Sequence, residues 1–489
     1  MFPINTSLSI IIYIAIILFI SSLFIRRAIH SFEDYSIADR SLGIIYTFFS
    51  YFSTWISGAI IIGLAGSAFK WGLYQYWIIA VSYCIGLISA PLFLMRIRAL
   101  NVYTLGDFFA LRFPEKENQV RVVISLTVIL RNITIIGAQF STIAFFTSLA
   151  FNIHFIYALI LTSLFIILYT ALSGMWGVVG TDVIQGLFQT IGLPLLLFLI
   201  IKSSGGLSSI FSFYDHIDGS HFLDLFGGSN RASQISFYFI APGLFFIIED
   251  QTTWQRIIAS KSDKVAYWGY LAPIGAAMLW LLFPCYIGVF SKVIFPNFTA
   301  FPIALFEYIL SLPKAASAII LISLISAAMS TCDSYLLASG VSFTHDIYKK
   351  IIHQEAKEKE LITMSSLAVM ATGVLAFFSS VLIYDIFNLY ILGAFISGSM
   401  VVVPYLFTWF SKRINAQGII NGTLSGGLSF LTFAFIFHQS YGFSMFVSLI
   451  LNIIVSYITA FLWKKPELPI VNETYYWSPK FKDVPNVPK

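Results

Sequence analysis

One segment of the sequence decides how the rest is interpreted: Ala327-Ala328-Met329-Ser330-Thr331-Cys332-Asp333-Ser334, which lies within an otherwise apolar stretch. Ala327, Ser330, Thr331 and Ser334 follow the i, i+3, i+4, i+7 spacing, so in a helix they share one face, with Asp333 at its edge. A carboxylate and several hydroxyls at membrane depth are costly unless something compensates them. Hard cations such as Na⁺ prefer oxygen ligands of this kind. The segment therefore predicts a cation site, and the alternative is a helix whose hydroxyls bond back to their own carbonyls.

The composition indicates an integral membrane protein. Of the 489 residues, 58% are hydrophobic and only 10% are charged, and the mean hydropathy is +0.86. Soluble domains carry about 25% charged residues. The three cysteines, Cys84, Cys285 and Cys332, all lie in apolar segments, which argues against a disulfide framework or a zinc site. The apolar run at the N-terminus ends in Arg26-Arg27 without a small-residue cleavage site, so we expect it to be a retained first helix.

Apolar runs of about 20 residues, the length that spans a bilayer, recur along the whole chain and predict an all-α fold of about thirteen transmembrane helices. Their expected limits are 6–25, 43–69, 72–95, 121–149, 153–173, 177–201, 234–255, 266–291, 315–347, 361–383, 386–410, 415–437 and 442–463.

The distribution of basic residues predicts the orientation in the membrane. With the N-terminus outside, 22 of the 28 lysine and arginine residues fall in segments assigned to the cytoplasm, and five fall on the opposite side. The net charge of +5 thus reflects topology and does not indicate nucleic-acid binding. We expect a multi-pass protein of the plasma (inner) membrane with a cytoplasmic C-terminus.

Two of the predicted spans contain helix-breaking residues. The second contains Ser57-Gly58 and Gly63 to Ser67, and the seventh contains Ala241-Pro242-Gly243 followed by Glu249-Asp250-Gln251. In lipid, such breaks are tolerated where the backbone lines a cavity or binds a ligand. The five-span offset between them predicts a five-plus-five inverted repeat. The alternative is close helix packing through small residues.

Several ordered motifs resemble the sodium:solute symporter family, whose members carry proline, pantothenate, sugars, sialic acid or choline. They are Asp34-Tyr35 with Arg40-Ser41-Leu42-Gly43, Thr181-Asp182-Val183-Ile184-Gln185, Asp250-Gln251 with Trp254-Gln255-Arg256, Met329 to Leu337, and Asp346-Ile347-Tyr348. The resemblance covers nearly the whole chain and implies a LeuT-type fold with one leading and two trailing helices. The expected division is residues 1–42 as leading helix and loop, 43–202 and 234–410 as the two repeat halves, 203–233 as an extracytoplasmic loop, and 411–489 as trailing helices and tail.

The resemblance implies a main sodium site formed by the carbonyls of Ser53, Ile56 and Ala327 and the hydroxyls of Ser330 and Thr331. It further implies a second cation site, because Asp182, Ser330 and Ser334 match such a site in some members, and Asp333 adds a carboxylate at its edge. Asp182 could instead be a structural acid paired across helices. One departure concerns Trp55, which stands where the proline carriers have an aspartate, and this argues against proline as the solute.

Two polar residues are candidates for the solute site. Arg131 lies mid-span in Ile129 to Thr134, and an intramembrane arginine suggests a functional site with an anionic partner. The resemblance matches Arg131 to a carboxylate-binding arginine of the sialic-acid carriers, and Gln75 to a polar ligand-contacting position. The alternative is that Arg131 pairs permanently with Asp182, Glu249 or another buried acid.

The sequence therefore predicts a Na⁺-coupled symporter for a small organic solute, with a preference for an anionic or zwitterionic one. A neutral sugar, a choline-like cation, and a sensor built on a symporter-like bundle remain alternatives. A membrane enzyme is disfavoured because no reactive His/Cys or Ser/His/Asp set clusters within the spans. We expect one or two bound Na⁺ and contact with the lipid bilayer, with no nucleic-acid partner and no obligate protein partner.

Overall fold

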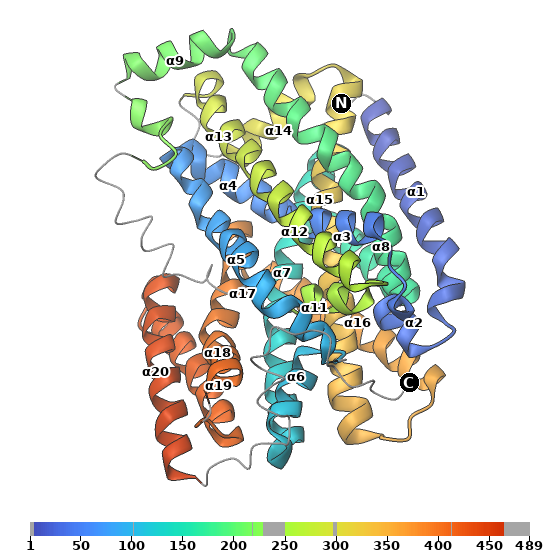
Figure 1. Cartoon of the computed structure of the whole chain (residues 1–489). Helices are drawn as coiled ribbons and strands as arrows, with labels where there is room; N and C mark the ends of the chain where they lie inside the picture. Colours follow the sequence, from blue (N-terminus) through green and yellow to red (C-terminus); the bar gives the residue numbers. More distant parts are fainter. Residues whose placement is uncertain are drawn as a thin grey trace.

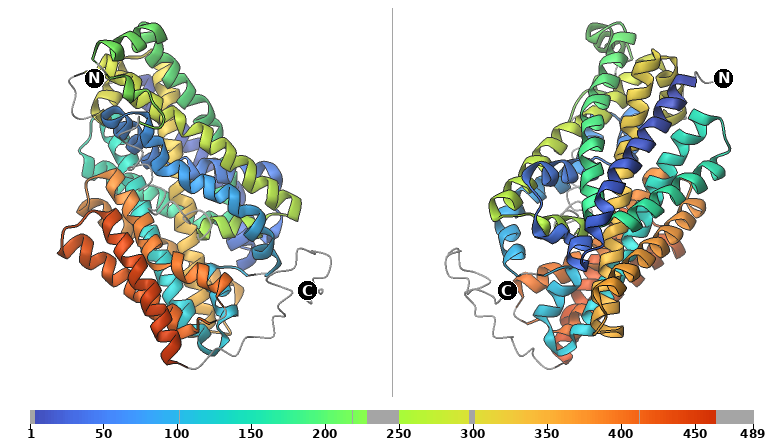
Figure 2. Two further views of the ribbon diagram at one scale, coloured as in Figure 1. Left: turned by 60° about the vertical axis from the view of Figure 1, so that its left-hand side comes forward. Right: turned by 90° about the vertical axis from the view of Figure 1, so that its right-hand side faces the viewer.

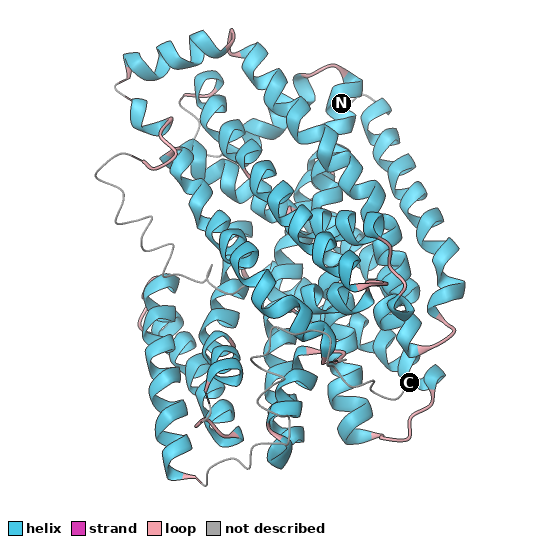
Figure 3. Ribbon diagram, in the orientation of Figure 1, coloured by secondary structure: helices cyan, strands magenta, loops and turns pink. Residues whose placement is uncertain are grey.

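The structure is a computed structural model that describes residues 4–100, 102–217, 219–227, 250–296, 301–411 and 413–463. Within these residues the regular secondary structure is entirely helical, and the one β-type contact is an isolated bridge between Leu42 and Ser260 (Figure 3). The all-α prediction is confirmed for this part of the chain.

Nine helical segments in the described residues are long and apolar enough to cross a membrane. They are α1 (Ile4–Ala28), α7 (Glu117–Phe151), α8 (Phe155–Ser203), α12 with α13 (Asp263–Trp280, Leu282–Ile294), α15 with the π-helical η7 (Lys314–Ser342, Phe343–Ile352), α16 (Glu358–Leu382), α17 with α18 (Ile386–Met400, Val402–Phe410), α19 with η8 (Ala416–Leu431, Thr432–Ile436), and α20 (Tyr441–Leu462).

Two bent pairs raise this number to eleven if each is counted as one span. One consists of α3 (Ile44–Trp55) and α4 (Gly58–Trp71), and the other lies within η2 (Leu73–Tyr76) and α5 (Trp77–Ala99). Shorter helices connect the spans: α2 (Phe32–Ile37), η1 (Ala38–Arg40), α6 (Leu105–Arg112), η3 (Pro114–Lys116), α9 (Leu207–His216), η4 (Ser220–Phe222), α11 (Gln251–Ala259) and α14 (Phe301–Ser311).

Gly174 divides α8 into two arms. Its backbone has φ 56° and ψ −160°, outside the helical region. At about 1.5 Å per residue, the 49 residues of α8 would extend roughly 74 Å as one straight helix, more than twice the bilayer core. A side chain at Gly174 would also meet the carbonyl oxygen of Tyr35 at 2.8 Å, so only glycine fits both the conformation and the space. The predicted spans 153–173 and 177–201 lie on either side of this residue.

The predicted seventh span, residues 234–255, lies mostly outside the described residues, and Ala241-Pro242-Gly243 and Glu249 lie there too. The total of thirteen spans and the inverted repeat therefore stay predictions. The break predicted in the second span is present, because α3 and α4 meet at an angle of 45°.

Among the membrane-spanning segments in the described residues, the one that contains α15 is the most buried, and α15 runs through the middle of the bundle (Figure 1). Every residue from 320 to 342 is buried, although many of them are polar. In contrast, α1 and α20 lie at opposite edges and have mostly exposed surfaces, with Phe19 at 64% and Phe461 at 91% exposure (Figures 1 and 2). Exposed apolar side chains in such number match a lipid surface and not water, so the chain is an integral membrane protein.

Candidate functional site

The break between α3 and α4 lies directly against α15. Ile56 ends α3 with φ −92° and ψ 69°, and Ser57 caps α4 by accepting a hydrogen bond from the Ile60 amide at 3.2 Å. A Cβ atom on Gly58 would lie 2.7 Å from the Cβ of Ala328, so the two backbones approach closely. The last carbonyls of a helix have no partner within it. The break therefore presents carbonyl oxygens of α3 to the polar face of α15.

Two hydroxyls of α15 use these carbonyls. Ser330 Oγ donates to the Ser53 carbonyl and Thr331 Oγ1 to the Thr54 carbonyl, each at 2.9 Å. Both hydroxyls also lie near the Ala327 carbonyl, at 3.3 and 3.1 Å, which is the back-bonding alternative weighed above. The structure thus brings together four of the five residues predicted for the main sodium site.

Ile56, the fifth predicted ligand, is buried at the end of α3, one turn beyond Ser53. No hydrogen bond in the described residues connects its carbonyl to Ser330 or Thr331. Gln189 of α8 lies beside the same oxygens: its Nε2 is 3.4 Å from the Ser53 carbonyl and 3.3 Å from Ser330 Oγ. Gln189 is not among the residues that the sequence predicts for this site.

A buried carboxylate lies behind these oxygens. Asp182 of α8 accepts hydrogen bonds from Ser50 Oγ and, at 3.1 Å, from Ser53 Oγ, and it is fully buried. Ser53 therefore faces both groups, with its carbonyl toward Ser330 and its hydroxyl toward Asp182. Ser53 therefore links the Ser330 hydroxyl to the Asp182 carboxylate, so a shift of either group can move the other.

The guanidinium of Arg256 lies among the residues predicted for the second cation. Its Nη2 donates to Ser334 Oγ at 2.6 Å and to Thr54 Oγ1 at 2.9 Å, and lies 3.4 Å from Asp182 Oδ2. Its Nε donates to Ser50 Oγ at 2.8 Å. Arg256 therefore supplies a fixed positive charge next to Asp182 and Ser334. Arg256 belongs to one of the motifs that resemble the family but has no role predicted from the sequence, although its position beside apolar residues indicates that it needs an acid.

Asp333 faces a different direction from Asp182. It accepts a hydrogen bond from Tyr169 OH at 2.9 Å, and Ser334 Oγ lies 3.5 Å from its other oxygen. It is fully buried, and the described residues form no ion pair with it. Of the four residues predicted for the second cation site, Asp182 and Ser334 share Arg256, and Asp333 lies beside them.

Arg131 forms a buried ion pair with Asp250, so its partner is neither Asp182 nor Glu249 but another buried acid, as the alternative allowed. Arg131 Nη2 lies 2.9 Å from Asp250 Oδ2, and each side chain is 1% exposed. Tyr335 OH donates to the same carboxylate oxygen at 2.5 Å, and the guanidinium lies over the Tyr335 ring. Asp250 also caps α11 by accepting from the Thr252 amide at 2.8 Å. The pair joins α7, α11 and α15.

Gln75 is buried in η2, at the far end of α4 from the break. Among the described residues, no hydrogen bond connects Gln75 to Arg131. Their shared contact with a solute stays a prediction.

Comparison with known proteins identifies the family. The model of the sodium:solute symporter family matches residues 35–426. The osmoregulated proline transporter OpuE of Bacillus subtilis (strain 168) is 26% identical over 452 residues, which covers 89% of this chain and 90% of that protein. A sodium/proline symporter of Staphylococcus aureus (strain USA300 / TCH1516) is 24% identical over 489 residues, covering 94% and 93%.

A solved structure shows the same fold. It is described as a substrate-bound outward-open state of a Na⁺-coupled sialic acid symporter, and it superimposes with a TM-score of 0.79 at 19% identity, over 96% of this chain and 100% of that one. Proteins of the matched family are transporters and not enzymes, and they couple sodium to the movement of a small organic solute. On the match of residues 35–426, this chain belongs to the sodium:solute symporter family.

Proposed function

We propose that this protein imports a small zwitterionic solute together with Na⁺ by alternating access across the plasma membrane, with its N-terminus outside and its C-terminus in the cytoplasm. The proposal of Na⁺ coupling rests on one observation: the hydroxyls of Ser330 and Thr331 contact backbone carbonyls at the end of α3, where the helix breaks. Na⁺ would bind the carbonyls of Ser53, Ile56 and Ala327 and the two hydroxyls, whose hydrogens turn away so that the oxygens face the ion.

The ion pair of Arg131 and Asp250 supports a zwitterionic solute. Removing one partner of a buried pair costs about 3–5 kcal/mol, because the other charge is left uncompensated. A solute with only a carboxylate would compensate Arg131 and leave Asp250 without its cation. In a solute with both groups, the carboxylate can pair with Arg131 and the ammonium group with Asp250, so both buried charges stay compensated. A neutral solute would leave the pair intact.

The resemblance to proline carriers does not make proline the preferred zwitterion. Trp55, which replaces the aspartate of those carriers, is buried against Tyr51, Tyr83 and Tyr270, with ring centroids 4.6 to 6.0 Å apart. It presents an aromatic surface beside the break, at the position that the resemblance matches to an aspartate of the proline carriers.

The second cation site, formed by Asp182, Ser334 and Asp333, stays a prediction. The position of Arg256 among these residues favours one Na⁺ per cycle, because the guanidinium neutralises one of the two buried carboxylates and leaves only a single negative charge for a bound cation. The repeat halves at 43–202 and 234–410 would move relative to each other around these sites.

The decisive experiment is a panel of solutes tested on the purified protein with and without Na⁺. We expect Na⁺-dependent thermal stabilisation by zwitterionic amino acids or betaines, and none by monocarboxylates, neutral sugars or choline. Asp250→Asn is the matched variant, since asparagine caps a helix as well as aspartate and removes only the charge. It should abolish binding of a solute with an ammonium group. Equal binding of a neutral sugar by wild type and Asp250→Asn would refute the zwitterion proposal.

A further inference from the structure

One side chain at the break between α3 and α4 has a buried donor without a partner in the described part of the chain. Gln139 of α7 is 0% exposed, and its Oε1 accepts a hydrogen bond from the Ala59 amide of α4 at 3.1 Å. A backbone amide only donates, so the atom that faces it must be the oxygen, and Nε2 points the other way. Among the described residues, Nε2 has no hydrogen-bond partner. Buried donors normally have one, because an unmatched donor is costly.

The oxygen of Gln139 completes the cap of α4. Ser57 Oγ accepts from the Ile60 amide at 3.2 Å, and the Ser57 carbonyl accepts from the Ile61 amide at 3.0 Å. The Ala59 amide, which has no partner within the helix because it lies in the first turn, donates to Gln139 instead. Capping uses the oxygen alone, so it fixes the orientation of the side-chain amide and does not account for its NH₂ group.

Gln139 lies on the side of α7 that is turned toward α15. Asn132, seven residues earlier and therefore on the same side of the helix, donates to Ser339 Oγ of α15 at 2.9 Å. The Ile136 carbonyl lies 3.8 Å from Cys332 Sγ, which also belongs to α15. Since the oxygen of Gln139 contacts α4, this side chain lies where α4, α7 and α15 meet, in the same interior region as the break.

Tyr390 of α17 connects the break with the proposed solute site. Its side chain is hydrogen-bonded to Ser57, and it interacts electrostatically with both Arg131 and Asp250. Arg131 and Gln139 are both on α7, eight residues or about 12 Å apart along the helix axis. A solute whose carboxylate and ammonium group are held by Arg131 and Asp250 would therefore meet Gln139 with its other end.

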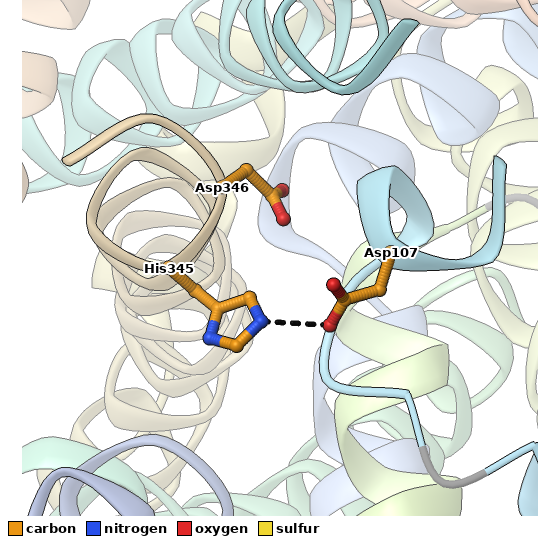
Figure 4. Close-up of side chains that lie close together, drawn as sticks. All are labelled: Asp107, His345 and Asp346. Carbon is orange, nitrogen blue, oxygen red and sulfur yellow. Dashed lines mark ion pairs between the residues drawn. The ribbon is translucent and has the colours of Figure 1, made fainter. Parts of the chain in front are cut away.

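Another buried polar cluster shows the opposite case, in which the protein matches its own groups. Asp107 of α6 and His345 and Asp346 of η7 turn their side chains toward one another (Figure 4). His345 Nε2 lies 2.7 Å from Asp107 Oδ2, and Arg121 Nη1 contacts both carboxylates. These carboxylates therefore have partners within the protein, whereas the donor of Gln139 needs an acceptor from outside the described residues.

We propose that Gln139 is a further solute contact, whose Nε2 donates to an oxygen that the solute carries away from its carboxylate and ammonium group. This role rests on the proposed function, which places those two groups at Arg131 and Asp250. The solute would then be a zwitterion with a third polar group, such as a hydroxyl, carbonyl or carboxamide oxygen. Because the cap on α4 already holds the amide in place, the contact needs no reordering of the side chain. A zwitterion with a purely apolar tail would leave Nε2 without an acceptor.

Matched pairs of zwitterions test this proposal on purified protein in Na⁺, with thermal stabilisation as the measure of binding. Homoserine and norvaline differ only in a terminal hydroxyl, and glutamine and homoleucine differ only in a terminal carboxamide. Wild type should bind the oxygen-bearing member of a pair about tenfold or more tightly than its apolar counterpart. Gln139→Met keeps the length of the side chain but removes the donor, so it should bind both members equally. Ser141→Ala removes another buried polar group of α7 and is the control that should keep the preference.

A second variant separates the donor of Gln139 from its cap. Gln139→Glu keeps an oxygen for the Ala59 amide, so it preserves the cap on α4 that Gln139→Met loses. A carboxylate at a helix N-terminus is favoured in its charged form, which has no hydrogen to donate. Gln139→Glu should therefore lose the preference as well. If Gln139 served only as a cap, Gln139→Met would lower the thermal stability and leave the preference within each pair unchanged.

Three results would overturn the role of Gln139. One is equal affinity of wild type for both members of every pair that binds. Another is a zwitterion without a third polar group that binds wild type more tightly than any that carries one. Both are measured on wild type, so they decide the matter even if the variants fail to fold. The third is a preference, or tight binding of any other zwitterion with a third oxygen, that survives in both variants. Absence of Na⁺-dependent binding by every zwitterion would instead refute the proposed function.

Discussion

Replacing Ser330 and Thr331 by alanine tests the main sodium site most directly. Each hydroxyl lies 2.9 Å from a carbonyl of α3, and the two would provide two of the five oxygens around Na⁺. A hydrogen bond or contact to a charged group contributes about 1.5–3 kcal/mol. At the lower value, loss of both contacts weakens Na⁺ binding by about 3 kcal/mol. Each 1.4 kcal/mol changes the dissociation constant about tenfold, so the Na⁺ concentration for half-saturation should rise about 100-fold.

The assay is the thermal stabilisation of the purified protein as a function of Na⁺ concentration, which needs no knowledge of the solute. Each single variant should shift the midpoint by about tenfold, since each removes one contact of about 1.5 kcal/mol. Ser326→Ala is the matched control, because Ser326 is a buried hydroxyl of the same helix that donates to Tyr13 OH at 2.8 Å, away from α3. A double variant that folds and keeps the wild-type Na⁺ midpoint would refute the site.

Three further predictions follow from the geometry. Asp182→Asn should lower thermal stability by breaking a buried ion pair, a loss of about 3–5 kcal/mol, with the Hill coefficient for Na⁺ unchanged. A lower Hill coefficient at wild-type stability would instead place a second Na⁺ at Asp182. Arg131→Lys should keep the fold but sharply reduce solute affinity, because the two-pronged guanidinium is lost, whereas intact affinity together with misfolding of Arg131→Ala would show a purely structural pair. Gly174→Ala should reduce thermal stability by at least about 1–3 kcal/mol from backbone strain, and Gly275→Ala, where a Cβ meets nothing within 4 Å, is the control that should not.

The local pattern predicted those parts of the site that depend on spacing along one helix. The hydroxyls of Ser330 and Thr331 share a face because a helix repeats every 3.6 residues. Ser57-Gly58 begins α4 because serine caps the start of a helix and glycine permits close approach to α15. These features are encoded within a few residues, so they can be recognised without the rest of the fold.

The partners of the buried charges could not be predicted in the same way. Asp250 meets Arg131, and Arg256 meets Asp182, only because distant helices are packed side by side. The sequence contains several acidic residues that could pair with either arginine. Hydropathy does not show which residues of two different spans lie side by side. The spans predicted at 153–173 and 177–201 do divide α8 where the break lies, but a single glycine is common within membrane helices, so the sequence alone does not identify Gly174 as the residue that forms it.

The buried carboxylates of Asp182 and Asp333 outnumber the guanidinium of Arg256 by one. This excess has to be neutralised by whichever small cation is present, so in the absence of salt we expect the protein to take up a proton there. Sodium and hydrogen ions would then exclude each other, and by thermodynamic reciprocity each weakens the binding of the other to the same degree. Adding NaCl, but not choline chloride, to the protein in weakly buffered solution should acidify that solution, and a pH-sensitive dye that records no change would refute this expectation. A carrier of this kind would become less responsive to sodium as its surroundings turn acidic.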